Sequence, residues 1–417
     1  MSPHTDHQPH SASPKDADPM ESYTKLAGDV RDPYPMLAAM LAEAPVHRID
    51  LGHLIGRDTG GVKNPALFTV LGYEAVHEVL GDSKTYSSAI YDKVMGPVMG
   101  HTILAMDAPE HMSHRGKIAH VFRARALTRW SDAVIGATVD DLIDRFAARG
   151  SADLIRELTF PFPVQVIAKI LGLPPEDYKD FQRLSLDLIS IQNDRPAGLA
   201  ASRALSEYFT PLIRERRADP RDDVISDLVR AEIDGRPLAD EEILPFLLLL
   251  LPAGAETTYR SSSNLLFGLL SRPEQLAEVK ADPETLLPQA IEEALRWEPP
   301  LLNVVRAPVR DVQLAGVDIP AGAMISVSIA SAGRDAGRYA DPDVFDLHRD
   351  PEQHIAFGHG MHLCLGMHLA RLETRIMVTR LLQRLPDLRL DPDAQDVHIH
   401  GLMFRSPPEL PVLFTPA

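Results

Sequence analysis

The chain contains a single cysteine, Cys364, which lies in the glycine-rich loop 357–366. One cysteine in 417 residues cannot form an internal disulfide, so no cross-link holds this fold and Cys364 must serve packing or thiolate chemistry. The glycines around it predict a tight loop whose backbone can approach a large flat ligand. An apolar helical pattern follows over 365–381, so the sulfur is expected near a helix N-terminus, where backbone N–H groups favour a thiolate.

The apolar periodicity predicts a mainly α chain with a small β-rich part. Helices are predicted over 35–41, 72–80, 110–122, 131–149, 161–172, 176–191, 200–218, 223–232, 239–270, 273–280 and 284–297. Strands are predicted over 67–71, 302–306, 312–319, 323–327 and 410–414, and a long loop over 83–104. The helix 239–270 is unusually long and is expected to cross the core. No internal repeat or interdomain linker is evident, so 23–417 is expected to form one domain.

Charge and apolar runs exclude two classes of protein. The formal net charge of −17 argues against a general nucleic-acid binder, which needs a basic surface. No stretch reaches the roughly 18 apolar residues of a membrane span, and the run 246–251 is enclosed by Pro245 and Pro252. Residues 1–22 are polar and lack the apolar core of a signal peptide, so we expect a disordered tail, no membrane association and a cytoplasmic location.

The longest predicted helix contains the segment 252–258, in which small residues are followed by an acid and two hydroxyls. Gly254 weakens a helix by about 1 kcal/mol relative to alanine. Pro252 cannot donate a backbone hydrogen bond, so a bend is expected here. From the residues alone, Glu256, Thr257 and Thr258 fit a helix-packing site with incidental polar groups as well as a reactive site.

The cysteine loop has the pattern Phe-x-x-Gly-x-x-x-Cys-x-Gly, which resembles the haem-binding loop of the cytochromes P450 at every fixed position. The alternative is a buried free cysteine beside a glycine-rich turn. The resemblance implies the helical fold of that family, haem b as the cofactor and the Cys364 thiolate as the axial ligand of the iron. It also implies that Phe357, Gly358 and Gly366 contact the cofactor. The chain resembles the soluble bacterial members of the family.

The segment 252–258 is similar to the family's (Ala/Gly)-Gly-x-(Asp/Glu)-Thr-Thr motif in the helix above the haem. By this resemblance Thr257 is the alcohol that hydrogen-bonds dioxygen, Glu256 is the acid that relays protons, and Ala253 faces the cofactor. Cleavage of the O–O bond needs two protons, which a titratable group connected through water can supply. Pro252, directly before the motif, is less usual in the family.

Glu293 and Arg296 are three residues apart and share one face of a predicted helix. Alone, this spacing means little, because exposed pairs of this kind are common. Its position upstream of the cysteine loop resembles the family's Glu-x-x-Arg helix. The resemblance pairs both residues with Arg349 in a structural network of buried charges that braces the loop. Loss of one partner would then cost about 3–5 kcal/mol.

Four residues resemble the groups that bind the haem propionates in the family. His111 and Arg115 are four residues apart and match the His-x-x-x-Arg that follows Asp-x-Pro. Arg306 and His362 match the other two positions. Arginine and histidine pair well with carboxylates, although each residue alone could be an ordinary surface charge.

A local basic region stands out in this acidic chain, because no Asp or Glu occurs between Glu110 and Asp132. Such runs are usually solvated helix faces. The functional alternative is a docking site for an acidic electron donor, steered by complementary charge. The resemblance implies a ferredoxin, with its ferredoxin reductase, as that donor. The candidate docking residues are Arg115, Lys117, Arg123 and Arg125.

The resemblance spans most of the chain and implies a haem-thiolate monooxygenase. Such an enzyme inserts one atom of O2 into a hydrophobic small molecule and releases the other as water, with two electrons from its redox partners. A terpenoid, steroid, fatty acid or polyketide substrate all remain open. The candidate substrate contacts, each of which could instead be ordinary core, are Tyr86, Ile90, Tyr91, Met95, Met99, Leu249, Leu302, Asn303, Val304, Met403 and Phe404.

Two other functions remain open at this point. A peroxide-driven haem enzyme of the same fold would act without a ferredoxin, but its known forms lack the acid–alcohol pair that Glu256 and Thr257 supply here. A haem sensor or carrier would usually have an additional signalling domain, and none is evident in the sequence.

Overall fold

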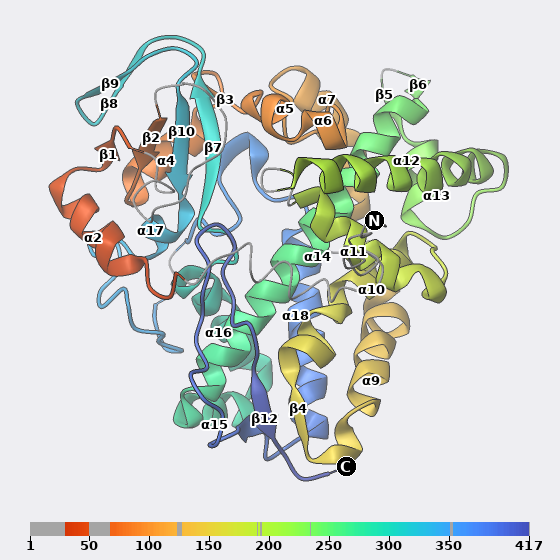
Figure 1. Ribbon diagram of the computed structural model, residues 1–417, viewed down its shortest axis with the longest axis vertical. Helices are drawn as coiled ribbons and strands as arrows, with labels where there is room; N and C mark the ends of the chain where they lie inside the picture. Colours follow the sequence, from red (N-terminus) through yellow and green to blue (C-terminus); the bar gives the residue numbers. More distant parts are fainter. Residues whose placement is uncertain are drawn as a thin grey trace, which may run out of the picture.

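The computed structural model describes residues 30–49, 67–122, 127–189, 191, 194–233, 235–350 and 353–416. The predicted tail 1–22 lies outside them. The helical part confirms the expected mainly α architecture and occupies the right and lower portions of Figure 1. Its helices are α7 (Glu110–Ile118), α9 (Ala137–Asp144), α10 (Pro161–Ile170), α11 (Tyr178–Ile189), α12 (Arg195–Ala218), α13 (Val224–Arg230), α14 (Asp240–Leu270), α15 (Pro273–Ala281), α16 (Pro283–Trp297) and α18 (Met367–Arg384).

The small β-rich part lies at the upper left of Figure 1, together with α2 (Tyr34–Glu43), α4 (Tyr73–Gly81) and α17 (Ile329–Gly333). Its main sheet has the strand order β1-β2-β10-β7-β3, in which only the β2–β10 pair is parallel. These strands are β1 (Val46–His47), β2 (Leu67–Val70), β10 (Met324–Ser328), β7 (Asn303–Pro308) and β3 (Tyr86–Ser87). The register pairs Ile325 with Arg306 and Tyr86 with Pro308. Strand β7, which follows α16 in the chain, therefore lies between β10 and β3.

Smaller sheets complete the β structure. One joins β11 (Arg389–Leu390), β12 (Pro411–Leu413) and β4 (Ser151–Asp153), so the end of the chain pairs with an early segment. The other two are hairpins, β5 (Glu232–Ile233) with β6 (Arg236–Pro237) and β8 (Val312–Leu314) with β9 (Val317–Ile319).

Helix α14 is continuous from Asp240 to Leu270, with Pro245 and Pro252 inside it. Three acids in its first turn complement the positive end of the helix dipole, and the Glu242 carboxylate accepts a hydrogen bond from the Ala239 N–H at 2.7 Å. It contacts α10, α11, α12, α16 and α18. The prediction that this helix crosses the core is confirmed, whereas the bend at Pro252 stays a prediction.

Three segments differ from the predictions. The region 83–104 is not one long loop, because it contains β3, α5 (Ile90–Val94) and α6 (Gly96–Met99). The predicted helix 131–149 begins as a π-helical turn, Ser131–Gly136, before α9. The segment 312–319 is a hairpin, because Ala315 and Gly316 adopt positive φ angles of 47° and 82° that reverse the chain. Short apolar runs do not reveal these breaks, since a two-residue turn leaves the apolar pattern largely intact.

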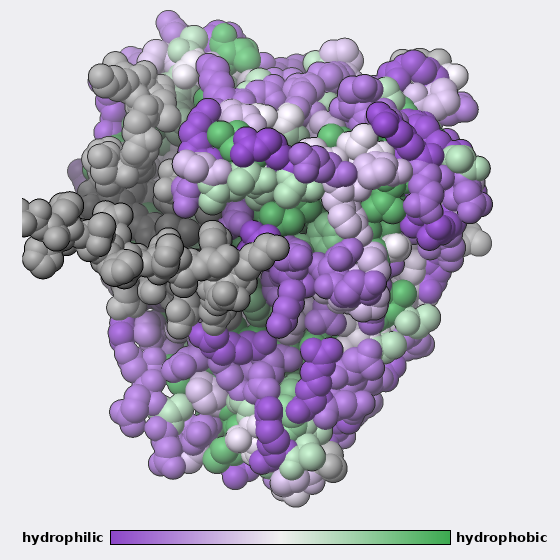
Figure 2. Space-filling view, turned by 45° about the vertical axis from the view of Figure 1, so that its right-hand side comes forward, coloured by the Kyte–Doolittle hydropathy of each residue, from purple (hydrophilic) through white to green (hydrophobic). Residues whose placement is uncertain are grey.

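Buried hydrophobic residues form a large helical core that includes α9, α10, α14 and α18. A second cluster fills the main sheet against α4, and a third lies under α2. Figure 2 shows one face of the molecule, where hydrophilic residues predominate and hydrophobic ones lie in small groups among them. The loop that carries Cys364 lies between the two larger parts, because its η8 turn (Gly360–His362) contacts α4 and α18 follows it directly.

Candidate active site

The cysteine loop folds tightly before α18. The Cys364 N–H donates to Phe357 O at 2.9 Å, and Gly358 and Gly360 have φ angles of 75° and 69°. A Cβ atom on Gly360 would stand 2.6 Å from Leu80 O of α4. Both the left-handed conformation and this close approach therefore require glycine at 360.

The Cys364 side chain is exposed, yet enough protein surrounds the sulfur that loss of solvation raises the thiol pKa. Hydrogen bonds from the backbone at Gly366 and Met367 oppose this rise, as do the positive charges of Arg115 and Arg371. The expected effect of the helix N-terminus is therefore present, but in the protein alone the pKa is raised overall. A coordinated metal cation deprotonates a thiol outright, which would reverse this balance.

Helix α7, strand β7 and the cysteine loop bring His111, Arg115, Arg306 and His362 into one charged cluster. The rings of His111 and His362 lie 4.3 Å apart between centroids. Arg115 donates to Leu363 O, and Arg306 is only 5% exposed. Burial, followed by repulsion from the arginines, lowers the pKa of His111 to about 4 and that of His362 to about 3.

This cluster contains buried polar atoms that the rest of the described chain does not satisfy. Both ring nitrogens of His111 and Nε2 of His362 have no hydrogen-bond partner among the described residues. Buried polar groups in native proteins are normally paired. Donors and positive charge gathered beside a cysteine suit a ligand with carboxylate groups.

The segment 252–258 of α14 points its acid and its alcohol to different partners. The Thr257 hydroxyl donates to Ala253 O at 2.8 Å, and Ala253 itself is exposed. Glu256 is buried and pairs with Arg260 at 2.7 Å, with both side chains no more than 3% exposed. Arg260 also donates to the Ser406 hydroxyl at 2.8 Å. The sequence motif does not reveal Arg260, although an acid and a base at i and i+4 on a helix are a usable signal.

The structure brings Glu293, Arg296 and Arg349 together in one network of ion pairs. Two nitrogens of Arg296 donate to the two oxygens of Glu293 at 2.7 Å each, and Arg349 Nε donates to Glu293 Oε1 at 3.2 Å. Arg296 also donates to the carbonyls of Gly333 and Pro342. The network thereby joins α16 to the irregular chain that leads to Cys364.

Glu373 is a buried acid that the sequence did not single out. It lies on α18, is 1% exposed, and its Oε1 has no partner among the described residues. Burial raises its pKa well above the usual range, and a hydrogen bond from Thr258 on α14 opposes the rise only partly. A glutamate in a helical sequence normally indicates an exposed face, so only the crossing of α14 and α18 identifies it.

The candidate substrate contacts lie in different environments: some form hydrogen bonds near the sheet, and others pack in the core. Tyr91 accepts a hydrogen bond from Val305 N at 3.1 Å, and the Asn303 amide donates to the Ser326 hydroxyl. Leu302 is 1% exposed and packs in the core under α2. Phe404 faces the buried Arg260, whose guanidinium carbon lies 5.6 Å from its ring centroid.

The remaining candidates range from core to surface. Ile90 and Met99 are buried, and Met95, Leu249 and Val304 are partly buried against the two larger cores. Met403 is 45% exposed. Tyr86 packs in the sheet core and lines a cavity whose lining includes neither Thr257 nor Cys364.

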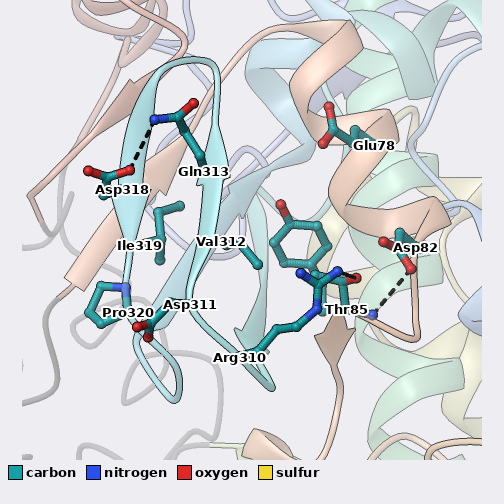
Figure 3. Close-up of a pocket in the computed structure, with 11 residues that line it drawn as sticks. Glu78, Asp82, Thr85, Arg310, Asp311, Val312, Gln313, Asp318, Ile319 and Pro320 are labelled. Atoms are coloured by element: carbon teal, nitrogen blue, oxygen red, sulfur yellow. Dashed lines mark hydrogen bonds between the residues drawn. The ribbon is translucent and has the colours of Figure 1, made fainter.

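That cavity, of about 620 Å³, lies between α4 and the β8–β9 hairpin (Figure 3). None of its lining residues belongs to the cysteine loop or to α14. Its aspartates are already engaged: Asp82 accepts from Thr85 N, Asp311 from Ala321 N and Asp318 from Gln313. The cavity is thus a polar groove at the surface, separate from the cysteine loop and from α14.

The candidate docking residues are not equivalent. Arg115 points inward to Leu363 O, whereas Lys117 is exposed on α7. Arg123 and Arg125 lie outside the described residues. Arg129, from the same acid-free region, pairs with Asp222 and Asp227 at 3.0 and 2.6 Å, so distant acids neutralise part of this region.

Known proteins resemble the chain over most of its length. The model of the family described as Cytochrome P450 matches residues 176–411. The cytochrome P450 monooxygenase PikC of Streptomyces venezuelae is 39% identical over 368 residues, 86% of this chain and 85% of PikC. A steroid C26-monooxygenase of Mycobacterium tuberculosis is 37% identical over 352 residues, 83% of this chain and 88% of that protein. The crystal structure of CYP109E1 from Bacillus megaterium with testosterone is 33% identical, with a TM-score of 0.81 over 92% of this chain and 99% of that one.

The chain therefore belongs to the cytochrome P450 family. It is a monooxygenase, an oxidoreductase that incorporates one oxygen atom. The family implies a haem-thiolate cofactor, and the residues present fit one: an exposed sulfur, an exposed Ala253 on α14, and unpartnered histidine nitrogens beside two arginines. Among the described residues, no helix has the length and apolar character needed to cross a membrane.

Proposed function

We propose that the protein hydroxylates a hydrophobic small molecule in the cytoplasm, using O2, haem b and two electrons from a ferredoxin and its reductase. The observation that carries this proposal is the group of unpartnered nitrogens on His111 and His362 beside the exposed Cys364 sulfur. It offers one soft metal ligand together with donors for carboxylates. Buried polar atoms in native proteins normally have partners, so a ligand that accepts hydrogen bonds here would complete the cluster.

We assign the binding roles as follows. Cys364 would hold the iron, and His111, Arg115, Arg306 and His362 would bind the propionates. When bound, the haem supplies the chemistry that cleaves O2 and attacks an unreactive C–H bond. The protein's own task is to orient the substrate, exclude water and move protons.

Proton movement is assigned to α14. The Thr257 hydroxyl donates its proton to Ala253 O, so its lone pairs remain available to accept a hydrogen bond. Glu256 is held by Arg260, so it must turn about its side-chain torsions before it can deliver a proton towards Thr257. In this division Thr257 accepts the hydrogen bond that keeps a proton in place, and Glu256 supplies the next proton.

The substrate class is proposed from two relatives and from the apolar candidates near α14. One relative is named a steroid C26-monooxygenase, and one solved neighbour was crystallised with testosterone. We therefore propose a steroid-sized hydrophobic substrate, with Leu249, Val304 and Phe404 among its contacts.

The proposal is tested with haem-loaded protein and a panel of steroids and long-chain fatty acids. A ligand that displaces water from the iron shifts the haem absorbance band, which identifies a substrate for turnover with ferredoxin and reductase. Thr257→Ala should then lower the share of consumed O2 that appears as product by about tenfold or more, with peroxide in its place. Thr257→Ser is the matched control and should retain coupling.

Two results would contradict the proposal. Activity with peroxide but none with any ferredoxin would favour the peroxide-driven alternative. Full coupling in Thr257→Ala would remove the role assigned to that hydroxyl while leaving the family assignment intact.

A further inference from the structure

A second ion-pair network lies behind the cysteine loop, beside the one formed by Glu293. Glu292, the residue before it on α16, accepts two hydrogen bonds from Arg371 of α18 at 2.6 Å each. His354 Nε2 also hydrogen-bonds Glu292, at 3.0 Å. Neighbouring glutamates on one helix therefore pair with arginines that precede and follow Cys364 in the chain. The bidentate geometry fixes the plane of the Arg371 guanidinium.

Arg371 also contacts the loop through an aromatic ring. Its guanidinium carbon lies 4.5 Å from the Phe357 ring centroid, within the range of a cation–π interaction. The backbone carbonyl of Phe357 accepts the Cys364 N–H. Phe357 and Arg371 both border a cavity of only about 10 Å³ between α14, α16 and α18, which leaves the ring little room to move. Arg371 is thus fixed relative to the sulfur by packing as well as by charge.

The two charges of this pair act on the sulfur with opposite signs. Arg371 places its positive charge against Phe357, whose carbonyl accepts the Cys364 N–H, and so favours negative charge on the nearby sulfur. Glu292 is paired with Arg371 and neutralises part of that positive charge. Side-chain exposures of 33% for Arg371 and 41% for Glu292 weaken both effects without abolishing them.

We propose that the Glu292–Arg371 pair positions the Phe357 ring and sets the electron density that Cys364 donates, and thereby the reduction potential of the iron it binds. The inference rests on the proposed function, because it takes Cys364 as the iron ligand. It assigns Glu292 and Arg371 as positioning residues that act through Phe357 and the electrostatic field. A purely structural brace would make a different prediction, since loss of either partner would loosen the loop in the same way.

The midpoint potential of the haem-loaded, substrate-free protein separates these alternatives. Arg371→Gln removes a positive charge, so the ferric form should be favoured and the potential should fall. Glu292→Gln exposes the charge of Arg371, so the potential should rise. We expect each variant to change the ferric-to-ferrous ratio at a fixed applied potential by about three- to tenfold. The double variant should lie between the two single ones.

Matched controls make the same chemical changes elsewhere on the same helices. Arg375→Gln lies on the exposed side of α18, and Glu284→Gln on the exposed first turn of α16. Both should leave the potential unchanged. Arg371→Lys keeps the charge but loses the bidentate pairing, so its potential should stay closer to that of the unmodified protein than the potential of Arg371→Gln does.

Shifts of the same sign in Arg371→Gln and Glu292→Gln would overturn the proposal in favour of a brace. An unchanged potential in Glu292→Gln would overturn it even if Arg371→Gln failed to take up haem. If Cys364→Ala bound haem with the same carbon monoxide spectrum as the unmodified protein, the proposed function itself would fail. The two failures are therefore distinguishable.

Discussion

At the scale of single residues, Glu256 shows how a motif can identify a group without defining its partner. Its sequence neighbour is Thr257, but its carboxylate is bound to Arg260, one helical turn further on. Adjacent residues on a helix point about 100° apart, so an acid and an alcohol in sequence do not face each other. Glu256 therefore pairs with Arg260, the nearest positive charge on the same helix face.

His111 leads to a prediction about pH. Its pKa is about 4 in the folded protein, against 6.5 in an unfolded chain. The unfolded state therefore binds the proton first as pH falls, and stability is lost progressively from about pH 6.5 down to about 4. Urea unfolding of the haem-free protein should show His111→Gln losing about 2 kcal/mol less than the unmodified protein between pH 7.5 and 5.

His368, which is exposed on α18, provides the control for this experiment. Because an exposed ring loses little solvation on folding, His368→Gln should leave the pH dependence nearly as it is in the unmodified protein. An equally steep loss of stability in His111→Gln would show that its ring is not kept neutral by burial.

At the scale of elements, α16 acts as an anchor for three other segments. Arg296 at its end binds the carbonyl of Gly333 at the end of α17, and Glu293 and Glu292 hold the chain before and after Cys364. The sequence indicated the Glu293 contact through family resemblance. It did not indicate the contacts of Glu292, because two consecutive glutamates on a helix normally suggest a solvated face.

Gly333 provides a test of the contact between α16 and α17. A Cβ atom there would fall well inside van der Waals contact with Arg296 O, a backbone atom that cannot rotate away. We expect Gly333→Ala to lower the free energy of unfolding by about 2 kcal/mol or more. Gly116→Ala on α7 meets nothing within 4 Å and should instead stabilise by up to about 1 kcal/mol. Equal effects in thermal or urea unfolding would contradict this explanation.

Removal of the Glu293 charge tests the buried network itself. Glu293→Gln would leave Arg296, which is 3% exposed, without its carboxylate. The expected loss is about 3–5 kcal/mol, measured by denaturant unfolding. Glu274→Gln, on the exposed side of α15, should change stability by less than about 0.5 kcal/mol. A small loss in Glu293→Gln would mean that hydrogen bonds to backbone carbonyls satisfy Arg296 alone.

At the scale of the whole molecule, the net charge of −17 makes any basic surface significant for an acidic partner. In the part of the chain that the structure describes, fewer basic side chains are exposed than the acid-free stretch between Glu110 and Asp132 suggests. Arg129 is paired with acids from the α12–α13 region and Arg115 is turned inward, so Lys117 is the exposed basic residue that α7 contributes. A stretch of sequence gives only the number of charged residues, whereas the fold decides which of their side chains are exposed.

The docking hypothesis predicts a salt-dependent reduction rate. Reduction by an acidic ferredoxin should slow as ionic strength rises, and Lys117→Glu should slow it by about tenfold at low salt. Lys179→Glu, exposed on α11, is the control and should have little effect. Stopped-flow reduction measures both. Unchanged rates in Lys117→Glu and in a variant with Arg123 and Arg125 reversed would place the docking surface elsewhere.

The sequence by itself determined the cysteine loop, the family and most of the helices. These features depend on residues close together in the chain, such as glycines that only one loop geometry requires and apolar residues at helical spacing. The tertiary structure decided the partners that polar and charged groups find on other elements: Arg371 for Glu292, Ser406 for Arg260, and Thr258 for Glu373. The physical reason is that a charge in a low-dielectric interior pairs with whatever group the crossing helices bring to it. Sequence spacing indicates such partners only within one helix.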